Sequence, residues 1–427
     1  MKIKPIQFRI HTKQNNYKQC LFFLAYGLYL IASVWDISFF QIQYGGIAYK
    51  WMLFFIALLL IVNESLRIKI RFRAFAFAIV TILILSVIYI THNSDIILNQ
   101  ITWILLFILA ARDIEFQEIA DFTLKLDCLI FATVLVCAAF GIIKNYVEAG
   151  ARVRYYLGFK YSLYPSIFLS NITALIIWIQ KDQIRWSTLL FLFGINIVIY
   201  ELTDSRLAFG LCVFMLLCAT VMKWRVQHRI NIVSNKKHIH IGKIAIFSFI
   251  ICLIVSVSVT YAYSENSNFQ NRLNDTLGGR LELGQDSLKQ HGVKPFGQAI
   301  KMSGNALNEK GHRDLSKTHG VYNYVDCMYI QMLQNFGWVV TTLIIALMTI
   351  AMYRAHQKQD HYLLMIGVIL AIHGIIDDAI LNVYQNTFWL VIAPLVIRPW
   401  IKKRSVLKQQ RIERKYKESH YAETEVN

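Results

Sequence analysis

The chain has 427 residues, of which 56% are hydrophobic and only 16% are charged, and its formal net charge is +18. Soluble proteins are on average about 45–50% apolar and about 25% charged, so this composition excludes an ordinary soluble enzyme and also a disordered chain. The apolar residues form long blocks without alternation, which excludes an outer-membrane barrel.

Apolar runs long enough to cross a bilayer as helices follow one another along the chain. Hydropathy predicts about twelve membrane-spanning helices. The expected fold class is therefore an all-α polytopic membrane protein, with one integral membrane domain over 1–427. In chain order the predicted spans are 20–40, 45–62, 72–90, 96–111, 122–143, 163–179, 186–200, 206–222, 244–263, 328–352, 362–380 and 384–397.

The Lys and Arg residues are distributed unevenly between the two sides of these spans. If the N-terminus is cytoplasmic, 30 of the 44 lie in cytoplasmic segments. Because cytoplasmic loops are enriched in Lys and Arg, both termini are predicted to be cytoplasmic. The basic tail 398–427 is interpreted as a topological and anionic-lipid anchor, so the net charge does not predict binding to nucleic acid.

Two segments on the predicted external side are more than connectors. The first, 144–162, mixes cations with tyrosines, and the second, 264–327, is a large loop between the ninth and tenth spans in which 281–290 predicts a short amphipathic helix after Gly279. Arginine binds phosphate oxygens bidentately and stays charged at any relevant pH. The arginines considered for an anionic headgroup are Arg152, Arg154, Arg206, Arg272 and Arg280. The alternative, strongest for Arg272, is that they are solvated loop charges.

Ionisable residues inside membrane spans are functional candidates by default. His373 and Asp377 lie four residues apart in the eleventh predicted span, where they would share a helix face and could hydrogen-bond. Either a proton relay or a structural hydrogen bond would account for such a pair. Asp326, at the outer mouth of the tenth span, faces the same side as the arginines.

Several common catalytic signatures are absent from the sequence. It contains no Walker A motif, no HExxH and no GxSxG. The seven cysteines show no metal-ligand spacing. The sequence therefore predicts neither a metal site nor a cofactor.

The order of motifs in the second half resembles that of bacterial O-antigen and capsular-polysaccharide polymerases of the Wzy type and the related O-antigen ligases. A span opening with TDSRLAFG is followed by a large external loop with GGR and KPFG, and the next span begins VDCMYIQMLQNFGW. The matching residues are Ser205, Arg206, Gly279, Arg280, Pro295, Phe296, Gly297, Asp326, Tyr329, Leu333 and Gly337. The similarity covers about 200–385, and the first half shares only the hydropathy.

This resemblance implies a glycosyltransferase that needs no metal or nucleotide. A saccharide on undecaprenyl diphosphate would be transferred to a hydroxyl of another lipid-linked repeat unit, at the outer face of the bacterial cytoplasmic membrane. Arg280 and Arg206 would bind the diphosphate, assisted by Arg152 and Arg154, and Asp326 would be the base, with His319 as second choice. His373 and Asp377 would support the site. Expected partners are membrane lipids and the chain-length regulator and flippase of a capsule, exopolysaccharide or O-antigen pathway.

Two alternatives remain open at this stage. Ligases commonly carry a histidine where this chain has Asp326, which favours a polymerase over a ligase-type transferase. A lipid-linked oligosaccharide flippase would also suit twelve spans and a cationic cavity. Transporters, however, usually consist of two similar halves with short loops.

Overall fold

The computed structural model of the chain describes residues 14–45, 47–66, 72–92, 98–149, 152–228, 242–308, 310–312 and 322–398. His319 and all but the first residue of the predicted tail 398–427 lie outside the described residues. The described part is mostly helical, and its only named strands form one short hairpin. The all-α prediction is thus confirmed.

The helices follow the apolar runs of the sequence. The α-helices of the first half are α1 (Gln14–Ile37), α2 (Phe39–Tyr44), α3 (Ile47–Ser65), α4 (Phe72–His92), α5 (Gln100–Ala110), α6 (Phe116–Ala139), α7 (Tyr164–Gln180), α8 (Trp186–Thr203) and α9 (Arg206–Gln227). Those of the second half are α11 (Ser248–Tyr261), α12 (Asn268–Thr276), α13 (Arg280–His291), α14 (Met328–Gln331), α15 (Gly337–Gln357) and α16 (His361–Ile376). The short turns are η2 (Ala111–Asp113), η3 (Lys181–Gln183), η6 (Met332–Phe336), η7 (Ala379–Leu381), η8 (Thr387–Val391) and η9 (Ala393–Ile397).

Five helical stretches of the described chain are long and apolar enough to cross a membrane. They are Gln19–Ile37, Phe116–Ala139, Trp186–Thr203, Arg206–Gln227 and Met328–Gln357. Four shorter apolar stretches are Phe75–Ile90, Ser248–Tyr261, His361–Ile376 and Thr387–Ile397. These helices are consistent with a membrane protein.

Two predicted spans end or break earlier than expected. The eleventh stops at Ile376, and Asp377 has an extended backbone with φ −155° and ψ 136°, so the prediction that it continues the helix is wrong. The last span consists of the 3-10 turn η8 and the π-helical turn η9. Pro394 lies at the start of η9, and proline has no N–H to donate to a helical hydrogen bond.

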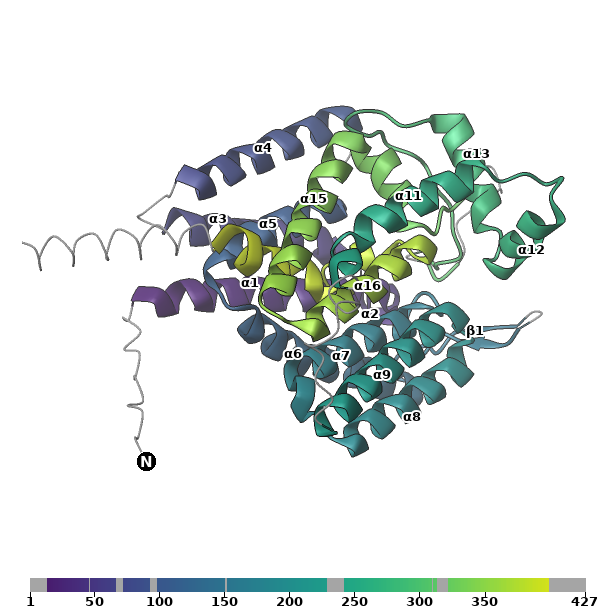
Figure 1. Cartoon of the computed structure of the whole chain (residues 1–427), viewed down its shortest axis with the longest axis horizontal. Coiled ribbons are helices and arrows are strands. Elements are labelled where there is room, and N and C mark those ends of the chain that lie inside the picture. The colour runs from purple at the N-terminus through teal and green to yellow at the C-terminus, as the bar shows by residue number, and fades with distance from the viewer. Residues whose placement is uncertain are drawn as a thin grey trace, which may run out of the picture.

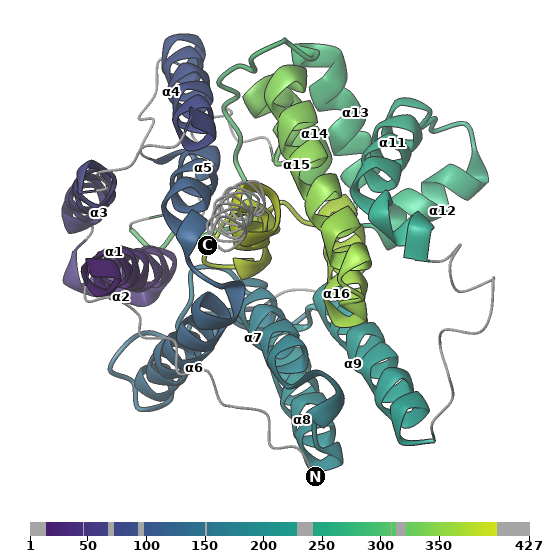
Figure 2. The ribbon, with the colours of Figure 1, turned by 60° about the vertical axis from the view of Figure 1, so that its left-hand side comes forward.

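The C-terminal turns lie at the centre of the helical assembly. In Figure 2, η8 and η9 are seen between α5 and α6 on one side and α15 on the other, and both sides contact them. Phe388 and Trp389 of η8 are fully buried there. The last apolar segment of the described chain is therefore part of the core.

The predicted external segments gather at one end of the molecule. The antiparallel hairpin β1 (Val147–Glu148) and β2 (Arg154–Tyr155) lies at the same end as α12 and α13, on the right in Figure 1. A backbone hydrogen bond of 2.9 Å from Leu307 N to Lys160 O joins the two segments. The first external segment thus packs against the large loop.

The KPFG and NFG motifs pack directly against each other. The Pro295 carbonyl accepts a hydrogen bond from Val339 N at 3.1 Å, and both Gly297 and Gly337 have positive φ angles. A Cβ atom on Gly297 would lie 2.1 Å from Asn335 O, and one on Gly337 would lie 2.3 Å from Gly297 N. Only glycine permits this approach of two backbones, which anchors the large loop to the helix after Asp326.

Candidate functional site

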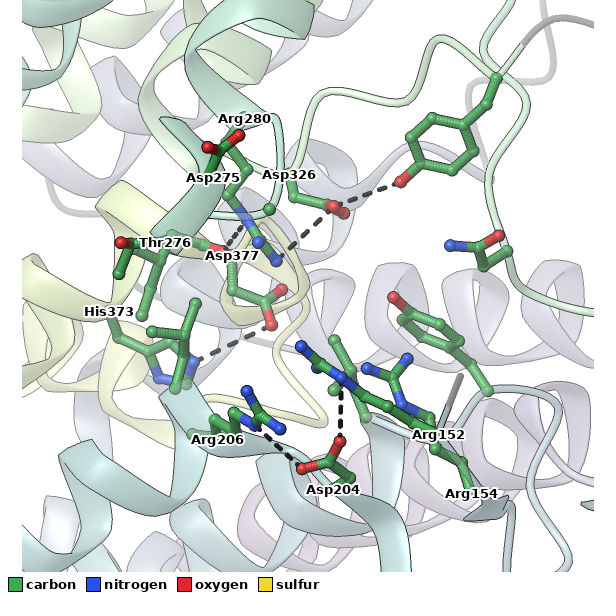
Figure 3. Close-up of a pocket in the computed structure, with 18 residues that line it drawn as sticks. Arg152, Arg154, Asp204, Arg206, Asp275, Thr276, Arg280, Asp326, His373 and Asp377 are labelled. Carbon is green, nitrogen blue, oxygen red and sulfur yellow. Dashed lines mark hydrogen bonds and ion pairs between the residues drawn. The ribbon is translucent and has the colours of Figure 1, made fainter. Parts of the chain in front are cut away.

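A cavity of about 780 Å³ lies at the end of the molecule that carries the hairpin and the large loop. Its lining comes from the hairpin, the turn between α8 and α9, the start of α13, the coil before α14 and the end of α16 (Figure 3). The predicted residues that line it are Arg152, Arg154, Arg206, Arg280, Asp326, His373 and Asp377. The fold therefore brings together every predicted site residue among those described, whereas Arg272 is not in the lining.

Three of these arginines, Arg152, Arg154 and Arg206, form what we call the arginine rim. Asp204 holds two of them: its carboxylate lies 3.3 Å from Arg152 Nε and 3.1 Å from Arg206 Nε (Figure 3). Asp204 itself sits in the turn between α8 and α9 with a left-handed backbone, φ 46°. Both pairs use Nε, so the terminal guanidinium nitrogens stay available to a ligand.

The two paired rim arginines remain largely open to solvent. The side chains of Arg152 and Arg206 are 45% and 59% exposed. Exposed ion pairs contribute little to stability, so either arginine can turn toward an anion at small cost. Arg154 also lines the cavity, and its buried Nε finds no hydrogen-bond partner among the described residues.

Arg280 is held quite differently. It opens α13 directly after Gly278 and Gly279, which both have positive φ, and its side chain is only 15% exposed. Nε donates to Ile376 O at 2.9 Å, Nη1 donates to Leu277 O at 2.6 Å, and Nη2 lies 3.6 Å from Asp326 Oδ2. The Ile376 contact places a cation at the C-terminus of α16, where helix carbonyls lack partners.

Asp326 lies next to Arg280 on the buried side of the cavity. The Tyr322 hydroxyl donates to its Oδ2 at 3.3 Å. The pKa of Asp326 is raised to about 6, mainly by burial; Arg280 acts against this rise and the nearby Asp377 adds to it. A carboxylate that titrates near neutral pH is suited to accept a proton from a substrate hydroxyl.

His373 and Asp377 meet at the cavity, although not on one helix face as predicted. Asp377 lies past the end of α16, where its Oδ1 accepts from Ala379 N at 2.8 Å. Its Oδ2 is 4.0 Å from His373 Nε2 (Figure 3). Arg280 binds the carbonyl of Ile376, the residue before Asp377. The extended backbone at Asp377 then directs its carboxylate back toward His373.

The sequence did not single out several groups near these residues. Asp275, Tyr161, Tyr322 and Asn305 also line the cavity. Asp378, which the sequence places beside Asp377 in the eleventh predicted span, accepts a hydrogen bond of 2.7 Å from Tyr324. The only sequence signal for the tyrosines was their abundance in 144–162 and around VYNYVD.

A second buried polar group lies among the helices away from the cavity. Asn171 on α7 donates from Nδ2 to Asp127 Oδ2 of α6 at 3.1 Å and to Thr387 Oγ1 at 3.0 Å, while its Oδ1 accepts from Thr387 N at 3.2 Å. These bonds join α6, α7 and η8. Asp127 was not predicted, although a carboxylate within an apolar run is itself a signal.

The described ranges contain no group of three or more His, Cys, Asp or Glu side chains arranged to hold a metal ion. Comparison with protein-family models, with curated proteins and with solved structures finds no match to this chain. The functional interpretation therefore depends on the cavity itself. It combines free guanidinium donors for an anion with a carboxylate able to accept a proton.

Proposed function

We propose that the protein is a polysaccharide polymerase of the bacterial cytoplasmic membrane, with about twelve spans and both termini in the cytoplasm. It would transfer a glycan from polyprenyl diphosphate to a lipid-linked repeat unit at the outer face, in capsule, exopolysaccharide or O-antigen synthesis. The observation that carries the proposal is the meeting of the arginine rim with Asp326 in one cavity. The motif order in the second half of the sequence supports it.

The proposed reaction is a displacement at the anomeric carbon of the donor sugar. A hydroxyl of the acceptor loses its proton to the Asp326 carboxylate while its oxygen forms the new glycosidic bond. The bond between the anomeric carbon and the diphosphate oxygen breaks, and the electron pair leaves with the lipid diphosphate. Preorganised guanidinium groups of the arginine rim stabilise the negative charge that develops there.

Arg280 contributes to this mechanism mainly by position. Its contacts with Ile376 and Asp326 link α13 to the end of α16 and to the proposed base. The remaining Nη hydrogens can still reach a phosphate oxygen. His373 and Asp377 support the acidic side of the cavity.

The test is the lipid-linked saccharide pool of a strain that lacks this gene, sized by mass spectrometry and assigned to a membrane face. A polymerase predicts that single repeat units accumulate on the outer face. Single units held on the inner face would identify a flippase and contradict the mechanism. Long chains left on their lipid would identify a ligase-type transferase.

A further inference from the structure

One part of the cavity lining has no role in the mechanism so far. It consists of Tyr161, Asn305 and Tyr322, which we call the tyrosine wall. Two hydrogen bonds hold the Asn305 segment between the other two: Ser303 N donates to the side-chain Oδ1 of Asn323 at 2.8 Å, next to Tyr322, and Leu307 N donates to Lys160 O at 2.9 Å, next to Tyr161. Three separate chain segments thus form one continuous surface.

The polar groups of this wall are left open toward the cavity. Among the described residues, no hydrogen-bond partner is found for the Tyr161 hydroxyl or for the Asn305 side-chain amide. The Tyr161 ring is fixed by an edge-on contact with Tyr164, with 5.5 Å between the ring centroids. Both side chains are partly buried and line the cavity, so these donors and acceptors are available to a ligand inside it.

The chemistry of the wall suits a neutral sugar better than a phosphate. Aromatic rings offer flat apolar faces to the C–H side of a pyranose, and an amide both donates to and accepts from hydroxyls. The charged groups that act on the Tyr161 hydroxyl are Asp326, Asp377 and Arg280, so carboxylates outnumber cations there. Two carboxylates so close would repel a diphosphate.

The position of the base Asp326 also favours a sugar, rather than a phosphate, at the tyrosine wall. A general base must lie within hydrogen-bond reach of the hydroxyl that it deprotonates, and Asp326 is itself hydrogen-bonded to Tyr322 of the wall. We propose that the tyrosine wall is the acceptor subsite, which binds the sugar whose hydroxyl attacks, separately from the arginine rim that binds the donor diphosphate. The proposal rests on the proposed polymerase function.

Binding of a lipid-free sugar tests the subsite directly. The probe is the repeat-unit oligosaccharide released by mild acid from the lipid-linked pool of the producing strain, and the full-length protein is held in lipid nanodiscs. Saturation-transfer NMR or calorimetry should show that Tyr161→Leu and Asn305→Ala each weaken binding by about 10-fold, the loss of roughly one contact. Arg206→Gln should bind the probe as the wild type does.

Tyr155→Leu is the matched control, because Tyr155 lies on β2 near the cavity, is 37% exposed and does not line it. In transfer assays with the same oligosaccharide on an alkyl chain as acceptor, the wall variants should raise the acceptor KM about 10-fold, for the same lost contact, and leave the donor KM unchanged.

Several results would overturn the acceptor subsite. They are a wild type that does not bind the probe, wall variants that bind it normally, or a rise in the donor KM instead. If the probe binds through the wall but no transfer occurs, the sugar site stands and the polymerase function fails. The two proposals therefore fail in distinguishable ways.

Discussion

Two arginine–aspartate sites border the same cavity, and they differ in how firmly the protein holds the arginine. At the rim, Arg152 and Arg206 share Asp204 and stay about half exposed. On the buried side, Arg280 contacts Asp326 and two backbone carbonyls and is 15% exposed. The first site has spare donors, whereas the second has most of its donors committed to the fold.

This difference suits the arginine rim to binding the anionic ligand and Arg280 to positioning Asp326. A solvated ion pair is easily exchanged for a ligand contact, since it is worth little by itself. A buried arginine with several partners cannot be replaced without leaving a buried carboxylate poorly paired. Substitutions at the two sites should therefore lower the activity for different reasons: loss of a ligand contact at the rim, and loss of the position of Asp326 at Arg280.

The largest effect is expected at Asp326. Asp326→Asn keeps the shape of the side chain but removes the proton acceptor, so kcat should fall by about 10²–10⁴-fold. Asp275→Asn is the matched control, because Asp275 also lines the cavity and has an exposed side chain. Transfer assays on both purified variants would check this, and a normal kcat for Asp326→Asn would remove it from the mechanism.

The transfer rate of the wild type should depend on pH through the titration of the Asp326 carboxylate. With a pKa of about 6 in the folded protein, Asp326 becomes protonated as the pH falls through 6, and the rate should drop there and level off above it. Burial raises this pKa above its usual range, so protonation favours the folded state, and acidification to pH 5 does not unfold the protein through this group. Thermal unfolding measured at pH 5 and above pH 6 separates loss of the transfer rate from loss of the fold.

The next largest effect is expected from Arg280→Lys. An ammonium group cannot contact Ile376 O, Leu277 O and Asp326 together, because its donors do not form a fork, so transfer should fall by about 10²-fold. Arg206→Lys, the same change at the exposed site, should retain most of the activity. Equal losses in polymer length for both variants would show that the two sites do not differ as argued.

Much of this site could be predicted because membrane spans make polar residues conspicuous. Arg206 and Asp326 stand at the edges of apolar runs, and the helix after Gly279 was expected and is observed as α13. Such features need only hydropathy and local backbone preferences. They place each residue at one end of a span but do not give its partner.

The features that were not predicted depend on contacts between distant segments. Asp377 leaves the helix where Arg280, from another loop, binds the last carbonyl of α16. Asn305 reaches the cavity only because its neighbours pair with segments near Lys160 and Asn323. Asp127 finds Asn171 and Thr387 by helix packing. No local sequence pattern predicts these contacts between distant segments.

The smallest effect is expected from removing one rim charge. Arg206→Gln should raise the donor KM by about 10-fold and also lower kcat, since Arg152 and Arg154 remain but the bound diphosphate and its developing charge lose one of three cations. The loss should shrink at high salt, because exposed charges are screened. Arg272→Gln removes a cation from α12 that does not line the cavity, so its donor KM should stay normal. If Arg272→Gln weakened the donor as much as Arg206→Gln, the rim would act only through its overall charge, and specific recognition by the free guanidinium groups would be excluded.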